Sequence, residues 1–378
     1  MFKKSYPIII TAVITCIVTA MLTFVFTTAY NARVSDNMKF RVIDGYLDSI
    51  YYGDFNKDRA MEYAYKGYVS SLGDPYTEYF TAEEYESFNT FMDNSYCGIG
   101  VVVRNDTEKN IIIVDSVFEN SPAMAAGIEA GDFITKVNGS AFTGAQLDDA
   151  VNTIKGEEGT EVTVTVVKGS TGEEKELTVL RKNVVMNTVE AEVLDGNIGY
   201  IYISQFGNNT AEEFATQLDK LNKYFIKGLI VDVRDNPGGT TVAVEAVASC
   251  LLPMDTVIYY TSDKAGNKQY IKSKMDGVDI PLVVLANENS ASAAEILVGA
   301  VKDNGRGTIV GTKTFGKGVV QSLIDLEDGT ALKITIERYY TPNGHYIQDK
   351  GIEPDYNVRL GEETDTQLEK AIEILNNR

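Results

Sequence analysis

The chain is poor in the residues that most hydrolases use for acid–base and metal chemistry. Its 378 residues contain one histidine, His345, with three cysteines and no tryptophan. No C-x-x-C or H-E-x-x-H pattern is present, so a metal site is not expected. A serine nucleophile needs a base, and with histidine almost absent a lysine is the natural candidate for that role.

Basic residues are also scarce. The 34 lysines and arginines are outnumbered by 54 aspartates and glutamates, which leaves a net charge of −20. Nucleic-acid binding needs clustered basic side chains at the phosphates, so we expect no nucleic-acid partner. Nothing around Cys97 or Cys250 indicates a disulfide, and Cys16 lies in an apolar run. No organic cofactor is predicted either.

A long apolar run lies near the N-terminus. Residues 7–30 read PIIITAVITCIVTAMLTFVFTTAY without a charge, and Lys3 and Lys4 precede them. A run of this length can cross a bilayer as a helix, and the preceding lysines favour a cytoplasmic N-terminus. We therefore predict a cytoplasmic tip and transmembrane anchor over 1–30, with the rest on the extracytoplasmic side of the cell membrane. A cleaved signal peptide is the alternative, although its apolar region is normally shorter.

Residues 31–94 have the spacing of helices. Apolar residues recur every three to four positions from Met38 to Tyr51 and again from Ala60 to Tyr68. After a Gly-Asp-Pro break at 73–75, Thr81 and Glu84 have the spacing of a capping box at the start of a further helix. We interpret this stretch as a packing element without chemistry of its own.

Residues 95–182 change to short strands separated by turns. A valine run at 101–103 follows the loop 98–100, and Asn138-Gly139 is a tight-turn signal. The order of elements, with SPAMAAGIEAGDFITKVNG at 121–139, resembles a PDZ domain. Leu147 and Val151 fall on a predicted helix, where they could line a groove or belong to the core.

The PDZ resemblance implies a binding loop for a peptide C-terminus. Glycines let consecutive backbone N–H groups converge on an anion, and a docked peptide can add a strand beside 101–103. The implied binding residues are Gly98, Ile99, Gly100 and Val101. Glycines that serve an ordinary turn are the alternative.

Residues 183–360 indicate a mixed α/β fold, and 361–378 a C-terminal helix. Strands are predicted at 198–203, 228–233 and 281–286, with an amphipathic helix at 210–221. A hairpin is predicted from 319 to 337, turning at Asp328-Gly329. Ser292 follows a buried strand and precedes an apolar helix, so its hydroxyl would lie at a strand-to-helix turn.

Three side chains in this region suit nucleophilic catalysis. Ser292 would lie near helix N–H groups, which favour developing negative charge; a plain helix cap is its alternative. Lys317, between two glycines, must be buried to act as a base, because an exposed lysine has a pKa near 10.4. A solvated turn lysine is its alternative. Gln321 lies four residues later and would face the same side of an extended strand.

A glycine-rich turn follows the strand at 228–233. The sequence Arg-Asp-Asn-Pro-Gly-Gly occupies 234–239. A backbone N–H from Gly238, or from Gly239, could join that of Ala293 in an oxyanion hole. A simple strand-ending turn is the alternative.

Together these segments resemble the carboxyl-terminal processing peptidases, the tail-specific proteases of S41 type. The matching motifs are SLGDPYTEYF (71–80), the PDZ-like region, VDVRDNPGG (231–239), NSASAAEI (289–296), GTKTFGKGVVQ (311–321) and YYTPNGHYIQDKGIEPD (339–355). The resemblance implies Ser292 as nucleophile, Lys317 as base and Gln321 as its positioning partner. It also implies a crotonase-like α/β protease core at 183–360, with 31–94 as its N-terminal helical part and a PDZ domain inserted at 95–182.

Two departures from the family pattern lie away from these side chains. Ala294 stands where the family often has serine, and His345 where a basic residue is frequent. The resemblance implies a membrane-anchored endopeptidase whose partners are proteins with unstructured, apolar C-termini. A PDZ scaffold that binds C-termini without cutting them is the alternative, and an esterase on the same core is another. The oligomeric state stays open, with a homo-oligomer among the outcomes.

Overall fold

The computed structural model describes the backbone of residues 6–377 and the side chains of 14–25 and 38–377. The chain divides into two compact units, residues 1–73 and 74–378, and each is described by itself.

The first unit is helical, as the periodicity predicts. It consists of α1 (Tyr6–Ile50) and α2 (Lys57–Ser70). Asn56 caps α2 by accepting a hydrogen bond from the Arg59 N–H at 2.9 Å. Within the described part of the chain, no helix has the combination of length and apolar character needed to cross a membrane. The transmembrane helix predicted over 7–30 is thus not supported, and 7–13 and 26–30 lie outside the described side chains.

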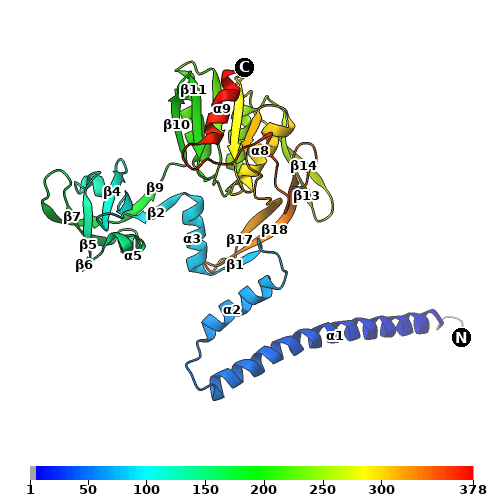
Figure 1. Cartoon of the computed structure of the whole chain (residues 1–378). Helices are drawn as coiled ribbons and strands as arrows, with labels where there is room; N and C mark the ends of the chain where they lie inside the picture. The colour runs from blue at the N-terminus through cyan, green and yellow to red at the C-terminus, as the bar shows by residue number, and fades with distance from the viewer. Residues whose placement is uncertain (1–5, 378) are drawn as a thin grey trace. The chain divides into compact units, whose positions relative to one another are not determined.

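The second unit contains a six-stranded sheet with the order β10-β11-β12-β15-β16-β19 (Figure 1). Its strands are β10 (Val189–Leu194), β11 (Ile198–Ile203), β12 (Gly228–Asp232), β15 (Leu282–Ala286), β16 (Thr308–Gly311) and β19 (Tyr356–Asn357). All neighbours are parallel except β10 and β11. The central strands are apolar throughout because both faces are covered by helices.

Helices cover the two faces of this sheet. On one face, α6 (Thr210–Asn222), α7 (Thr241–Leu251) and α8 (Ala293–Asp303) share a core with Ile201, Val231 and Val284. On the other face lies α9 (Thr366–Asn376), drawn in red in Figure 1. Its residues Ala371 and Leu375 pack among alternate residues of the same strands. The parallel strands therefore end at one edge, where the loops carrying residues 234–239 and 287–292 lie next to each other.

A second sheet carries the segment that follows Lys317. Its order is β1-β18-β13-β14, with β17 paired to β18. The strands are β1 (Glu78–Phe80), β13 (Val257–Asp263), β14 (Lys268–Lys272), β17 (Val319–Asp325) and β18 (Ala331–Tyr340). The predicted hairpin is confirmed as β17 and β18, and Gly329 has the positive φ (88°) that its turn requires.

Helix α3 (Ala82–Met92) leads from β1 to the inserted region, and its predicted capping box is confirmed by Thr81 and Glu84. The inserted sheet has the order β3-β4-β5-β7-β8, with β6 beside β5, and a two-stranded ribbon of β2 and β9 joins it to the rest. Its strands are β2 (Ser95–Gly98), β3 (Val101–Asp106), β4 (Ile111–Val117), β5 (Phe133–Val137), β6 (Ser140–Ala141), β7 (Glu161–Val167), β8 (Glu174–Leu180) and β9 (Lys182–Val185).

Short helices complete the inserted region. They are α4 (Pro122–Ala125), the 3₁₀ helix η1 (Gly144–Gln146) and α5 (Leu147–Ile154). Asn138 and Gly139 both have positive φ (49° and 78°), as the predicted tight turn needs. The domain boundaries given in the sequence analysis remain predictions.

Candidate active site

Ser292 occupies a strained turn between β15 and α8. Its φ and ψ are 56° and −114°, a backbone conformation that residues other than glycine rarely adopt. A serine held on such a strand-to-helix turn projects its hydroxyl out of the turn, and strain of this kind collects at functional sites. The half-buried Ser292 lines a cavity of about 480 Å³.

The same cavity gathers the predicted catalytic and oxyanion residues. Its lining includes Gly238, Gly239, Ser292, Lys317 and Gln321. The remaining wall is largely apolar, with contributions from α3, α8 and the β17–β18 hairpin: Phe88, Phe91, Met92, Ile296, Val319, Val320, Leu323 and Tyr339. Segments far apart in the sequence therefore meet where the residue pattern predicted chemistry.

A buried carboxylate joins the serine turn to the lysine loop. Glu295 is fully buried, and its Oε2 accepts from the N–H groups of Ser292 (2.9 Å) and Lys317 (2.8 Å). Its Oε1 accepts from Gly316 N–H and Thr314 Oγ, both at 2.7 Å. Burial raises the pKa of Glu295, against the effect of these hydrogen bonds. Glu295 is not among the predicted site residues, although its place three residues after Ser292 is the capping-box spacing.

Lys317 is half-buried, and its proposed role requires a lowered pKa. Burial lowers the pKa of its amine, and the positive charge of Lys333 lowers it further, while Asp74 and Glu295 act in the opposite direction. The Lys317 Nζ lies over the ring of Tyr76, 5.0 Å from the ring centroid. Among the described residues no hydrogen bond links Lys317 Nζ to Ser292, and apo catalytic contacts are often long.

Gln321 lines the same cavity as Lys317. Strand β17 begins at Val319, so Lys317 precedes it, and the register with β18 shifts between Val320 and Gln321, where Ile336 of β18 is the extra residue. Alternation along β17 therefore starts only at Val319, and the shared side of Lys317 and Gln321 stays a prediction. The Gln321 amide donates to Thr335 Oγ at 3.4 Å, and no bond to Lys317 is found in this part of the described chain.

The two predicted oxyanion donors meet beside Ser292. A Cβ atom at Gly238 would lie 2.8 Å from Ser292 Cβ and 3.0 Å from the Ala293 nitrogen, so only glycine fits there. However, the Gly238 N–H already donates to Asn236 Oδ1 at 2.8 Å. Because the Gly238 N–H is already hydrogen-bonded, Gly239 is the preferred oxyanion donor. A β-bridge to Phe206 holds Gly239 beside the same turn.

The predicted peptide-binding loop contributes in part to a groove in the inserted region. Ile99 and Val101 line this groove, whereas Gly98 and Gly100 flank Ile99 without lining it. Val151 of α5 lines the groove as well, whereas Leu147 packs against the core of the region. Helix α3 supplies Glu86, Ser87, Thr90 and Phe91 to the same groove, a contribution that the sequence analysis missed.

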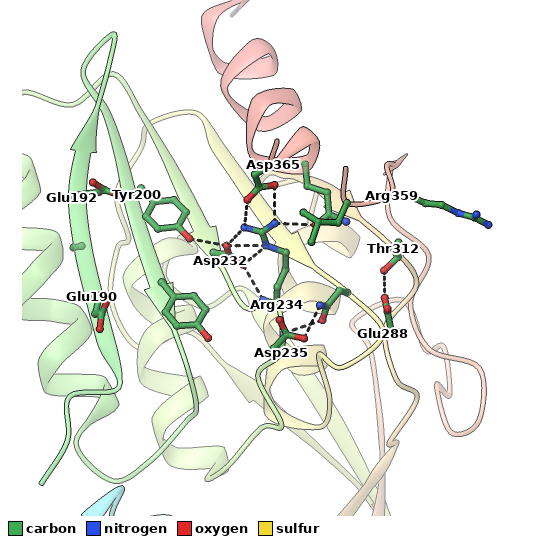
Figure 2. Close-up of a pocket in the computed structure, with 15 residues that line it drawn as sticks. Glu190, Glu192, Tyr200, Asp232, Arg234, Asp235, Glu288, Thr312, Arg359 and Asp365 are labelled. Carbon is green, nitrogen blue, oxygen red and sulfur yellow. Dashed lines mark hydrogen bonds and ion pairs between the residues drawn. The ribbon is translucent and has the colours of Figure 1, made fainter. Parts of the chain in front are cut away.

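A larger cavity of about 1090 Å³ lies at the same edge of the sheet and contains none of the predicted catalytic residues (Figure 2). At its centre Arg234 contacts Asp232 (2.6 Å) and Asp365 (2.8 Å), and Tyr200 donates to Asp232 at 2.8 Å. Burial acts to lower the pKa of Arg234, but these carboxylates outweigh it and raise the pKa. Because Asp365 caps α9, the cluster fastens that helix to the sheet. No group of His, Cys, Asp and Glu side chains suited to a metal ion occurs among the described residues.

Comparison with known proteins identifies the regions. The profile of peptidase family S41 matches residues 197–358, and that of the PDZ domain matches 89–167. A Staphylococcus aureus (strain MRSA252) protein named "Probable CtpA-like serine protease" is 35% identical over 355 residues, which cover 93% of this chain and 70% of its own length. A Staphylococcus epidermidis protein of the same name is 35% identical over 316 residues, with coverage of 82% and 63%.

Solved structures agree. The photosystem II D1 C-terminal processing protease is 28% identical with a TM-score of 0.51, over 89% of this chain and 90% of its own. A putative S41 protease from Bacteroides fragilis shares the fold, with a TM-score of 0.56 at 18% identity over 87% and 92% of the two chains. The class is thus a serine-type peptidase of mixed α/β fold that carries a PDZ domain. The chain belongs to peptidase family S41, among its C-terminal processing serine proteases.

Proposed function

We propose that this protein is an endopeptidase that cuts by acyl-enzyme chemistry, with Ser292 as nucleophile and Lys317 as base, on a crotonase-like core. The observation that carries the proposal is the convergence of a strained serine turn, a half-buried lysine with a lowered pKa and the glycine pair in one cavity. Glu295 supports it, because one carboxylate accepts hydrogen bonds from both Ser292 and Lys317 and fixes their backbones relative to each other.

The steps follow from these positions. Neutral Lys317 takes the hydroxyl proton as Ser292 Oγ attacks the scissile carbonyl carbon. The N–H groups of Ala293 and Gly239 are the proposed partners of the oxyanion, with Gly238 as the alternative donor. Collapse of the tetrahedral species breaks the C–N bond, and the leaving amine takes the proton from the Lys317 ammonium. Lys317 then takes a proton from a water that attacks the acyl carbon, the ester C–O bond breaks, and Ser292 Oγ takes that proton back from Lys317 as the acid product leaves. Gln321 is proposed to position the amine.

We also propose that the PDZ domain selects substrates by a free, apolar C-terminus. The groove lined by Ile99, Val101 and Val151 supports this, because a peptide can add a strand beside β3 and place its last side chain between β3 and α5. Proteins with unstructured apolar tails are the expected substrates. Anchoring in the cell membrane through residues 7–30, with the catalytic part outside the cytoplasm, is proposed from the uncharged run alone.

Tail docking is proposed to affect catalysis through α3. Phe91 lines both the PDZ groove and the catalytic cavity. The end of α3 is held by the loop before α6, since Gln205 donates to the Phe91 carbonyl and Asn208 to Asp93, both at 2.6 Å. In the same loop, Phe206 N–H donates to the Gly238 carbonyl at 2.8 Å. A tail that moves α3 can therefore act on the glycine pair beside Ser292.

The decisive experiment incubates the full chain, as wild type and Ser292→Ala, with an unfolded protein that has an apolar C-terminus, and follows fragments by mass spectrometry. Cleavage by wild type alone is expected, together with loss of cleavage when the substrate tail is amidated. Tail binding without cleavage would instead favour the PDZ scaffold, and equal cutting of the amidated form would remove tail recognition.

The coupling through α3 has a matched pair of variants. Asn208→Ala removes the contact to Asp93, whereas the adjacent, equally exposed Asn209→Ala does not. A free apolar tail peptide added in trans should change the rate on a short amidated substrate for wild type and Asn209→Ala. The response should be weakened in Asn208→Ala; an undiminished response would contradict coupling by this route.

A further inference from the structure

A second lysine shares the catalytic cavity with Lys317. Lys333 lies on β18 directly opposite Leu323 of β17, two residues from the pair formed by Thr335 and Gln321. Directly opposed residues of an antiparallel pair share one face of the sheet. Lys333, Leu323 and Gln321 all line the cavity that holds Ser292 and Lys317. The face of the hairpin that carries Gln321 therefore presents a second ammonium group to the site.

The Lys333 ammonium is held in place by its surroundings. It lies 4.8 Å from the ring centroid of Phe80 and 5.5 Å from that of Phe88, and the faces of aromatic rings attract cations. Glu78, opposite Lys333 on β1, contributes an ion pair at 3.0 Å. The Lys333 side chain is 22% exposed, whereas that of Glu78 is 54% exposed. Solvent therefore screens the charge of Glu78 more than that of Lys333.

Charged groups from several elements around Lys317 affect the protonation of its amine. Asp74, before β1, and Glu295, on α8, favour the ammonium form, and Lys333, on β18, opposes it together with burial. Asp74 is itself occupied: burial acts to raise its pKa, but hydrogen bonds involving Thr77, Thr335 and Tyr76 lower it. Two phenols complete the surroundings, Tyr76 beneath the amine and Tyr339, which donates to the Ser292 carbonyl at 3.2 Å.

We infer that Lys333 is a second cation of the catalytic site, which keeps the Lys317 amine unprotonated and able to take the proton of Ser292. The inference rests on the proposed serine–lysine chemistry and adds a residue to it. A positive charge close to an amine disfavours a second positive charge there, and enzymes activate lysine nucleophiles in the same way. Lys333 acts through Lys317 and does not contact the reacting atoms, so it is a positioning residue and not a catalytic one.

The inference can be tested in two directions. Lys333→Met removes the cation but keeps a flexible chain of similar length against Phe80 and Phe88. Glu78→Gln removes the partner anion and leaves the Lys333 charge uncompensated. Because the two changes alter the field at Lys317 with opposite sign, they should move the acid limb of the pH–rate profile in opposite directions. Lys333→Arg keeps the charge and serves as the matched control.

The experiment measures kcat and KM from pH 5 to 10 on one unstructured peptide for the full chain and these variants. Lys333→Met should move the acid limb upward by about half to one pH unit, a three- to tenfold loss on the limb that recovers at high pH. Glu78→Gln should move it downward by a smaller amount, because its screened charge acts from farther away. Lys333→Arg should keep the wild-type limb.

An unmoved limb in folded Lys333→Met would overturn the inference, and so would a raised KM with no change in the limb, which would mark Lys333 as a substrate contact. Circular dichroism shows whether each variant folds. If Lys333→Met does not fold, the half-exposed Glu78→Gln carries the test alone, and a limb that stays in place or rises overturns the inference. Lys317→Ala separates the two levels: if it stays active, the serine–lysine chemistry itself fails, whereas an inactive Lys317→Ala with unmoved limbs in the other variants defeats the role of Lys333 only.

Discussion

Two half-buried cations line different cavities of the second unit, and their surroundings shift their pKa values in opposite directions. Arg234, just after β12, contacts Asp232 and Asp365 within 2.8 Å, and its pKa rises (Figure 2). Lys317, in the loop between β16 and β17, has a ring beneath it and a second lysine in its cavity, and its pKa falls. A cation that forms two ion pairs stays charged and supports structure, whereas one for which no ion pair is found among the described residues can exchange a proton.

The largest effect should come from removing the unpaired cation. Lys317→Met deletes the proposed base, and we expect peptide cleavage to fall by about a thousandfold or more. Lys313→Met is the control, because Lys313 is an exposed lysine of the same loop. Cleavage rates of the purified full-length variants decide the matter. Activity in Lys317→Met near the level of Lys313→Met would mean that both lysines are structural.

Removing the paired cation should damage the fold instead. Arg234→Met leaves Asp232 and Asp365 without their partner, which should cost about 3 kcal/mol of unfolding free energy. Urea denaturation measures this loss. Arg359→Met is the matched control, since Arg359 is exposed at the rim of the same cavity and should change stability little (Figure 2). Equal losses in the two variants would show that the cluster does not hold α9 to the sheet.

Acidification should protonate Lys317 and stop its proposed work as a base, while Arg234 keeps its charge. In the proposed chemistry only neutral Lys317 accepts the serine proton, and the pKa of Lys317 lies below 10.5 mainly because of burial. The rate constant kcat/KM should therefore fall about tenfold per pH unit below that pKa. A pH–rate profile of the wild type, with circular dichroism at each pH to show that the fold persists, measures it. A flat profile on the acid side would be inconsistent with an amine as the base.

The smallest effect concerns stability at the lysine. The folded pKa of Lys317 is depressed, so the folded chain binds fewer protons than the unfolded chain, and stability is lost as pH falls from 10.5 through the folded value. Below that range Lys317 opposes folding, and Lys317→Met should be more stable than wild type at neutral pH by about 1 kcal/mol. Urea denaturation at pH 7 and at pH 10.5 should show this difference shrinking. A variant less stable than wild type at neutral pH would indicate that packing of the lysine chain outweighs its charge.

Much of the fold can be read from the sequence because periodicity and turn residues are strong there. β11 coincides with the predicted strand at 198–203, and Thr81 and Glu84 form the predicted cap of α3. Ser292 was placed at a strand-to-helix turn from the apolar strand before it and the apolar helix after it. These predictions depend on local patterns, which a single segment contains in full.

The parts that were missed depend on contacts between segments. The start of β17 at Val319, after Lys317, could not be read from the residue pattern, and neither could the register shift between β17 and β18. The engagement of the Gly238 N–H by Asn236 is a matter of one side-chain rotamer. Glu295 had a local signal, the capping-box spacing, but its second role at the Lys317 loop could be seen only once 292 and 317 were brought together.

The positive φ of Ser292 lowers the stability of the folded protein. A glycine would relax that conformation and stabilise the chain by about 1 kcal/mol, so the proposed nucleophile occupies a position where the most stable residue is an inert one. Selection for stability or yield alone would therefore favour glycine at this position and give a well-folded but inactive protein. A serine at this strained position is therefore explained by its proposed chemistry and not by the stability of the fold.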